Sequence, residues 1–319
     1  MKKFMIIGAA ALVMFTATGF TVKAGYPAES MYLTQTQKED VDYTKCKFNC
    51  KDFTGLDVGG IVKVNLVKSD TYKVDVTLPS VLKDYLDVRV KNGVLKIGWM
   101  KEIPAKIQKE LGSWTCKAEI AMPELKKLEM SGATSLTCDD TFDLGDKDFS
   151  LDISGVSNVK SLRINAEKLD AEVSGSCNIK IVGDFKEAEL DLSGVSKGNF
   201  KINADKLEAD VSGATRASIN GNIGKVEIDA SGTSEVSLEG KVGTLEVDAS
   251  GVSKIKAMGA EIEVAILETS GTANCNVNVT RSIIVNDATG VSEINYKAPK
   301  HFNIKVNSIS RLASVNKVN

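Results

Sequence analysis

The chain has 319 residues, of which 43% are hydrophobic and 26% are charged. A chain of this length and apolar content can bury a sizeable core, which excludes an intrinsically disordered protein. Its net charge of −2 gives no overall basic field, so we expect no nucleic-acid partner.

Residues 1–24 have the pattern of a secretory signal peptide. Residues 2–3 are both lysine, residues 4–15 are almost entirely apolar, and residues 22–24 read Val-Lys-Ala, an A-x-A-like cleavage site. The apolar region is too short to span a bilayer as a helix. We therefore expect an exported mature chain without a transmembrane segment, located in the periplasm, on the outer-membrane surface or outside the cell.

The next hundred residues are less regular. Residues 25–48 are polar and patternless, and we expect a flexible leader there. From Phe53 apolar residues alternate as in strands, and Asn92-Gly93 predicts a hairpin within residues 88–97. Residues 103–111 form either a short helix or a loop. We predict that these strands cap the end of the repeat that follows, because an uncovered sheet end exposes both core and backbone.

A Ser-Gly repeat occupies the rest of the chain. Its nine copies, the last of them Thr-Gly, are separated by 23, 20, 19, 19, 19, 19, 20 and 19 residues. They begin at Ser131, Ser154, Ser174, Ser193, Ser212, Ser231, Ser250, Ser270 and Thr289. A fixed period near 20 residues is typical of solenoids, in which each repeat forms one coil.

Apolar and polar residues alternate on both sides of each Ser-Gly pair. With its Ser as position 0, positions −5, −3, −1, +5 and +7 are mostly apolar; in one coil they are Leu207, Ala209, Val211, Ala217 and Ile219. A period of two indicates strands with one buried face. No helical period intervenes. We predict an all-β parallel β-solenoid of 19-residue coils, right-handed by the crossover rule, with two short strands and two turns per coil.

Two further positions explain the turns. Glycine at +1 allows the positive φ that a tight turn requires. Position +3 points inward by alternation, and we interpret it as a buried hydroxyl ladder that bonds to the turn backbone. Its members are Ser157, Cys177, Ser196, Thr215, Ser234, Ser253 and Ser292. Since no base accompanies these serines, we do not expect them to act as nucleophiles.

One outward face carries an acidic ladder at position −2. The ladder comprises Glu129, Asp152, Glu172, Asp191, Asp210, Asp229, Asp248, Glu268 and Asp287. Position −4 adds further acids, and lysines at −6 (Lys168, Lys206 and Lys225) can offset part of the charge. Two interpretations stay open: a solvated face, or Ca²⁺ binding by Asp191, Asp210, Asp229 and Asp248. The mid-strand position of the ladder argues against calcium, because calcium solenoids bind the ion in turns.

The opposite face is neutral to basic, and we call it the amide–lysine face. It comprises position +4 (Asn158, Asn178, Lys197, Arg216, Lys254 and Asn274) and position +6 (Lys160, Lys180, Asn199, Lys256 and Asn276). Such a face could bind a glycan or an anionic polymer, although solubility and edge protection explain it equally well. The ligand itself cannot be named from the sequence.

Six cysteines are present, and export permits disulfides. Cys177 and Cys275 occupy inward positions, and we expect buried free thiols there. Cys46 and Cys50 are close in sequence and are one candidate disulfide; Cys116 and Cys138, about one coil apart, are the other. The single histidine, His301, and the dispersed cysteines make a zinc site unexpected.

Three segments carry a resemblance to a known family. They are Asp52-Phe53 with 59–64 (GGIVKV), 92–97 (NGVLKI), and 123–125 (PEL) leading into 130–134 (MSGAT). Over about residues 50–300 the chain resembles the putative auto-transporter adhesin head GIN domain family. The resemblance implies an exported β-helical protein of Bacteroidetes-type bacteria with an adhesive role, and it supplies no catalytic or binding residues. Thr289, in place of the last Ser, departs from the pattern.

We therefore expect a single GIN-like solenoid domain over residues 49–319, with regular coils over about 123–300. The favoured function is that of an exported, non-catalytic surface or periplasmic protein without a cofactor, an adhesin or a glycan- or polymer-binding scaffold. The alternative is a carbohydrate-active enzyme, a lyase or hydrolase, on a β-helix scaffold. A cleft with two carboxylates that break the repeat would favour the enzyme.

Overall fold

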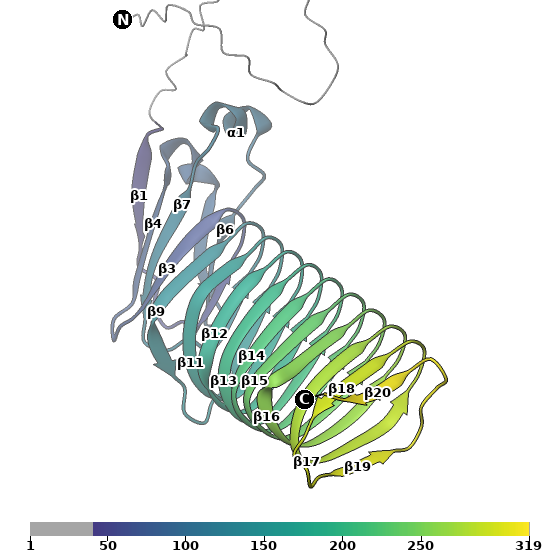
Figure 1. Ribbon diagram of the computed structural model, residues 1–319. Helices are drawn as coiled ribbons and strands as arrows, with labels where there is room; N and C mark the ends of the chain where they lie inside the picture. The colour runs from purple at the N-terminus through teal and green to yellow at the C-terminus, as the bar shows by residue number, and fades with distance from the viewer. Residues whose placement is uncertain (1–40, 319) are drawn as a thin grey trace, which may run out of the picture. The chain divides into compact units, whose positions relative to one another are not determined.

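The computed structural model describes residues 41–318, which belong to one compact unit (Figure 1). The predicted signal peptide and residues 25–40 of the predicted leader lie outside this range. No helix in the described range is long and apolar enough to cross a membrane.

The elements before the regular coils are short. They are β1 (Tyr43–Phe48), β2 (Gly55–Val58), β3 (Val62–Lys68), β4 (Lys73–Pro79), η1 (Ser80–Tyr85), β5 (Leu86–Lys91), β6 (Val94–Trp99), α1 (Ala105–Leu111), β7 (Cys116–Met122), β8 (Lys127–Met130), β9 (Ser135–Asp143) and β10 (Phe149–Ile153). The predicted hairpin is confirmed as β5–β6, which turns through Asn92 and Gly93, both at positive φ. The residues expected to form a short helix or loop include α1.

The regular coils follow, and each is one long strand. They are β11 (Asn158–Val173), β12 (Asn178–Leu192), β13 (Lys197–Val211), β14 (Arg216–Ala230), β15 (Glu235–Ala249), β16 (Lys254–Thr269) and β17 (Asn274–Ala288). The last coils are completed by β18 (Glu293–Lys297), β19 (Asn303–Val306) and β20 (Ser314–Lys317).

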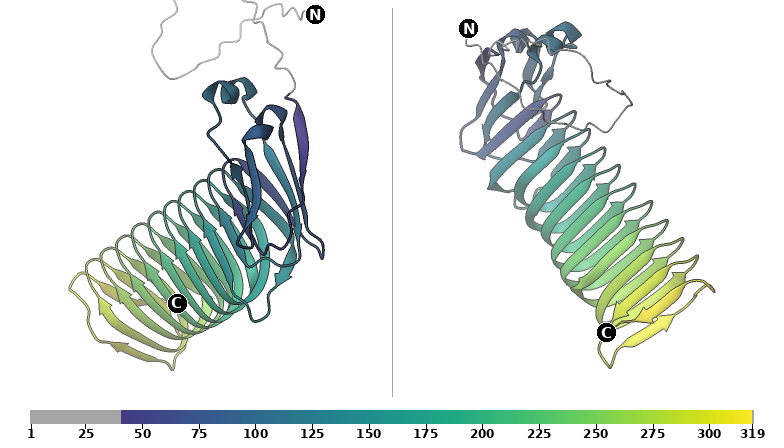
Figure 2. Two further views of the ribbon diagram at one scale, coloured as in Figure 1. Left: turned by 180° about the vertical axis from the view of Figure 1, so that it is seen from behind. Right: turned by 45° about the horizontal axis from the view of Figure 1, so that its top comes forward.

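The predicted parallel β-solenoid is confirmed. Each long strand pairs in parallel with its equivalent in the next coil, so that Asp191 lies beside Asp210 and Asp210 beside Asp229. Figure 2 shows the coils as a regular stack. The expectation of two strands per coil was wrong, because the backbone continues its strand pairing through the second bend and is interrupted only at the Ser-Gly turn.

The Ser-Gly turns stack so closely that only glycine fits at position +1. The nine turn glycines have φ between 68° and 79°. A Cβ atom on Gly213 would lie 2.6 Å from the carbonyl oxygen of Gly194 in the preceding coil. The same oxygen accepts a hydrogen bond from the Ala214 N–H at 2.8 Å. The repeat therefore marks a column in which one coil's backbone contacts the next.

The inward positions form one continuous core. Aliphatic side chains fill it, and the position +3 hydroxyls are buried with them. Ser157 Oγ donates to the Ser154 carbonyl at 2.7 Å, and Ser196 Oγ to the Gly175 carbonyl at 3.2 Å. These bonds confirm the hydroxyl ladder at these coils, but Ser234 and Ser253 lack any partner for Oγ.

The N-terminal region contains an extra coil. The strands β2 and β3 lie between β6 and β7 on one side and β8 and β9 on the other, all in parallel pairing. The Ala133 N–H donates to the Gly60 carbonyl at 2.7 Å, so Gly59-Gly60 is one more copy of the turn. Part of the segment expected to cap the solenoid is therefore a coil itself.

The cap consists of antiparallel strands outside this coil. In it, β4 pairs with β7 and β1, and β5 pairs with β6. The boundary of the flexible leader at residue 48 was too late, since residues 43–48 form β1. Its apolar positions alternate, with Cys46 and Phe48 packed against the core.

Candidate functional site

The amide–lysine face is present as an uninterrupted outward surface over the first coils. Lys197 of β13 lies directly beside Arg216 of β14, and Lys180 lies on the neighbouring β12. Two acids absent from the sequence-based description, Glu235 and Glu293, occupy position +4 farther along. Glu235 pairs with Lys256 at 2.7 Å. In β16, Lys254 and Lys256 lie beside Glu235, so the cations without a neighbouring acid on this face lie in the coils before β15.

The cations of these coils are unpaired. Within residues 41–318, no carboxylate forms an ion pair with Lys160, Lys180, Lys197, Lys201 or Arg216. Like charges directly opposite each other on neighbouring strands are destabilising. An anion bound across these strands would relieve that repulsion.

Of these cations, Lys201 lines a groove of about 430 Å³ that lies farther along the same strands. Its rim carries Arg163, Lys201 and Asn220, and its floor includes Gly183 and Gly221. A Cβ atom on Gly183 would lie 1.7 Å from the Ile164 carbonyl oxygen, and one on Gly221 equally close to that of Ile202. Glycine at these positions therefore allows the backbones of neighbouring coils to approach closely at the groove.

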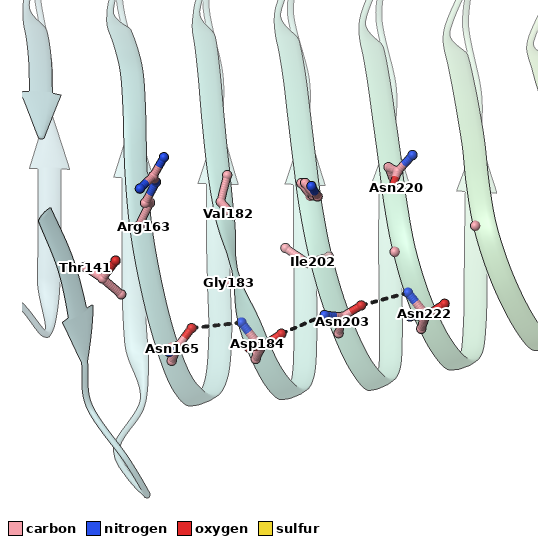
Figure 3. A pocket seen from close by; sticks show the side chains of 13 residues that line it. Thr141, Arg163, Asn165, Val182, Gly183, Asp184, Ile202, Asn203, Asn220 and Asn222 are labelled. Atoms are coloured by element: carbon pink, nitrogen blue, oxygen red, sulfur yellow. Dashed lines mark hydrogen bonds between the residues drawn. The ribbon is translucent and has the colours of Figure 1, made fainter. Parts of the chain in front are cut away.

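A chain of amide contacts runs along the lower edge of the groove (Figure 3). Asn165 Oδ1 accepts from the Asp184 N–H at 3.2 Å, Asn203 Nδ2 donates to Asp184 Oδ1 at 2.7 Å, and Asn203 Oδ1 accepts from the Asn222 N–H at 2.9 Å. These bonds fix the side chains at one-coil spacing. Asp184 is the only carboxylate that lines the groove among the described residues.

Sequence reasoning missed the groove residues. Lys201 and Asn203, at positions +8 and +10, continue the outward alternation of +4 and +6, and that alternation was the signal that could have found them. Arg163, at +9, is out of this alternation because the register shifts between Val159 and Leu162. The bend itself had no marker except the recurring glycine at +9.

Farther along, the same face is occupied by an asparagine ladder. Asn295 Nδ2 donates to Asn276 Oδ1 at 3.2 Å, and Asn316 Nδ2 donates to Asn295 Oδ1 at 3.3 Å. Asn276 in turn donates to Asn274. These amides satisfy one another, as stacked asparagines do in other parallel sheets, which leaves less capacity for a ligand than the groove has.

On the acidic face, the position −4 column is compensated by lysines, whereas in the position −2 column Glu129 alone has a lysine partner among the described residues, Lys127 at 2.7 Å. Lysines at position −6 reach acids at −4: Lys206 Nζ lies 3.2 Å from Glu227, and Lys225 Nζ lies 2.6 Å from Glu227 and 3.1 Å from Glu246. The first of these contacts crosses between coils. No lysine pairs with Asp210 or Asp229 of the acidic ladder among the described residues.

The charges of neighbouring aspartates in the acidic ladder affect one another's pKa. The pKa of Asp229 is raised, first by partial burial and then by the charges of Asp210 and Asp248, and the pKa of Asp210 is raised for the same kinds of reason. No group of three or more acidic, Cys or His side chains in residues 41–318 is arranged to hold a metal ion. A straight column such as Asp191, Asp210, Asp229 and Asp248 does not converge the six to eight oxygens that Ca²⁺ takes, which argues against the calcium interpretation of these residues.

Both predicted disulfides are absent from the described residues, whose cysteines are all free. Cys116 lies opposite Val62 on β3, whereas Thr137, next to Cys138, lies opposite Asn65 on the other side of that strand. The two cysteines are thus offset by four residues, about 13 Å, beyond the reach of a disulfide. Cys46 lies within β1, and the extended backbone of this strand separates Cys46 from Cys50 along the chain.

The buried thiols are inert rather than reactive. Burial raises the pKa of Cys275 to about 12 and that of Cys138 to about 11. Burial, with the nearby Cys46, raises the pKa of Cys116 to about 12. A thiol with such a pKa remains protonated at neutral pH, so these side chains act as small hydrophobic groups.

The irregular coil between Ser131 and Ser154 uses its acids structurally. Asp140 Oδ2 accepts from the Lys68 N–H at 2.8 Å, and Asp143 Oδ1 accepts from the Gly145 N–H at 3.3 Å. Both bonds shape backbone turns.

The chain is similar to several solved structures. A structure of a putative adhesin from Parabacteroides merdae is 16% identical, with a TM-score of 0.46, and the match covers 88% of this chain and 98% of that one. A putative adhesin from Parabacteroides distasonis is 18% identical, with a TM-score of 0.48 and the same coverage. A putative lipid binding protein from Parabacteroides distasonis is 20% identical, with a TM-score of 0.43 and the same coverage.

No curated protein matches the chain. The family model described as "Putative auto-transporter adhesin, head GIN domain" matches residues 52–220 and 197–299, most of the chain. The chain therefore belongs to the head GIN domain family of putative auto-transporter adhesins.

Proposed function

We propose that this chain is an exported, non-catalytic binding protein of the cell surface or periplasm, whose ligand is an acidic glycan or similar anionic polymer. The observation that carries the proposal is a group of unpaired cations on one face, namely Arg163 and Lys201, which line the groove, and Lys197 and Arg216, which lie side by side on β13 and β14. On the acidic face, by contrast, Lys206 and Lys225 have carboxylate partners.

The groove supports a polymer rather than a small ligand. Equivalent groups recur in successive coils about 4.8 Å apart, so a chain lying along the stack meets the same donors repeatedly. Amides that both donate and accept suit hydroxyl groups, and the cations suit carboxylate or sulfate groups. The signal-peptide pattern in residues 1–24 supports export.

The test compares two triple variants of residues 25–319. Lys197→Gln, Lys201→Gln and Arg216→Gln remove three of these unpaired cations, and the control Lys168→Gln, Lys206→Gln and Lys225→Gln removes three from the acidic face. Binding to polygalacturonate is measured against neutral dextran. At ~0.5–1 kcal/mol per cation, the first triple should weaken binding about tenfold to a hundredfold.

The control triple should bind like the wild type. An equal loss in both triples would show that net charge alone matters, and it would overturn the proposed site. Failure of the wild type to bind any acidic polysaccharide on a glycan array would overturn the ligand class.

A further inference from the structure

Within residues 41–318, no further coil stacks on the last one. Strand β19 pairs only with β17, and β20 only with β18, within the described residues. Ile304 and Val306 lie beside Ile283 and Val285, which are fully buried. Ile304 and Val306 occupy the same inward columns but are 43% and 41% exposed.

Additional apolar side chains surround this end. Ile309 is 48% exposed and Leu312 is 69% exposed, both in the turn that joins β19 to β20. Four large apolar residues are therefore exposed within one coil. A contiguous exposed apolar group of this kind marks an interaction surface more often than an isolated exposed residue does.

The same coil is strongly basic. Beyond Glu293 the sequence has no Asp or Glu, but it has Lys297, Lys300, Lys305, Arg311 and Lys317. None of them forms an ion pair within residues 41–318. Lys317 instead lies over the Phe302 ring, 4.9 Å from its centroid. At the other end of the stack, the antiparallel strands β1, β4 and β5 add to the sheets of the first coils.

We propose that the last coil docks on an anionic lipid bilayer. A second copy of the chain fits less well, since joining two such ends would bring two basic clusters together. A bilayer complements both properties: apolar side chains enter the interfacial region while lysine and arginine meet anionic headgroups.

Co-sedimentation with vesicles tests the proposal on residues 25–319. The wild type should bind vesicles of phosphatidylglycerol and phosphatidylcholine, and not vesicles of phosphatidylcholine alone. Replacing Ile309 and Leu312 with Ser, or Lys305 and Arg311 with Gln, should each weaken binding about tenfold or more. Because all four side chains are exposed, folding should persist, and circular dichroism checks it.

Two controls make the result specific. Val156→Ser with Val195→Ser removes exposed apolar groups from the Ser-Gly turns, and Lys83→Gln with Lys91→Gln removes cations near the cap; both should leave binding unchanged. All these variants retain the groove, so polygalacturonate binding reports separately on the proposed function. Equal binding by the end variants, or none by the wild type, would overturn the proposal. So would a wild-type dimer that Leu312→Ser dissociates, since a second copy would then cover this end.

Discussion

Removal of one charge from the acidic ladder should stabilise the protein. In Asp229→Asn the side chain keeps its shape but no longer repels Asp210 and Asp248, its neighbours in the adjacent coils. Coulomb's law gives about 0.9 kcal/mol for each neighbour at ~4.8 Å in water. Screening at physiological salt roughly halves this value, which leaves a gain of about 1 kcal/mol in total.

The pH dependence follows from the raised pKa of Asp229. The Asp229 carboxyl binds its proton more tightly in the folded state than in the unfolded state. Its ionisation therefore lowers the free energy of unfolding as pH rises from the unfolded pKa through the folded pKa. Asn should therefore stabilise the protein at neutral pH. The gain should vanish below the unfolded value of about pH 3.9, where both states are protonated.

Glu227→Gln is the matched control, two residues away on the same face. Glu227 has a lowered pKa, chiefly through its hydrogen bond to Lys225 and also through Lys206. The ionised Glu227 carboxylate stabilises the folded state at neutral pH, and this stabilisation is lost as pH falls through the folded pKa. Glu227→Gln should therefore lower the free energy of unfolding by about 0.2–1 kcal/mol at pH 7. The two substitutions should therefore change stability in opposite directions.

Thermal melts followed by circular dichroism, at pH 7 and pH 3.5 and at low and high salt, measure both effects. For Asp229→Asn we expect a rise in Tm of roughly 2–4 °C at pH 7, smaller in high salt. An unchanged or lowered Tm at pH 7 in low salt would refute the reasoning, as would a gain that persists undiminished at acid pH.

Two further predictions concern the turns and use melts of paired variants. Gly213→Ala should cost more than Gly93→Ala: both glycines have positive φ, which costs about 1–2 kcal/mol, but an added Cβ meets the Gly194 oxygen at 2.6 Å only at Gly213. Equal losses would show that contact between coils is unimportant. Ser157→Ala should cost about 1 kcal/mol for its lost hydrogen bonds, whereas Ser253→Ala, with no bond to lose, should be neutral; a reversed order would refute the hydroxyl-ladder argument.

The sequence predicted the regular coils well because their signals are local. The alternation around Ser212 identifies the buried side of a strand, and a constant period places equivalent residues side by side. The extra coil of β2 and β3 had no such signal, since its neighbours β6 and β8 come later in the chain and at irregular spacing. Similarly, Cys116 and Cys138 are about one coil apart in the sequence, which suggested that they lie close together. Their actual offset is set by the pairing of β3 with β7 on one side and with β9 on the other.

The sequence predicted the face on which the groove lies but not the bend that forms it. Asn199 and Lys197 were placed on the correct face because outward positions alternate with core positions. The bend that creates the groove depends on Gly183 and Gly221, where the backbones of adjacent coils approach, and such an approach becomes visible only once the coils are stacked.

The inserted coil also has a consequence for how the chain folds. In a plain solenoid each coil needs only its predecessor, so order can spread from one end with coupling between neighbours alone. Here β2 and β3 remain without partners until β6 to β9 are available, which ties residues 55–143 into one cooperative unit. A chain that folds from its N-terminus would therefore assemble its cap and first coils in a single step. That unit would then be the template on which the regular coils add in order.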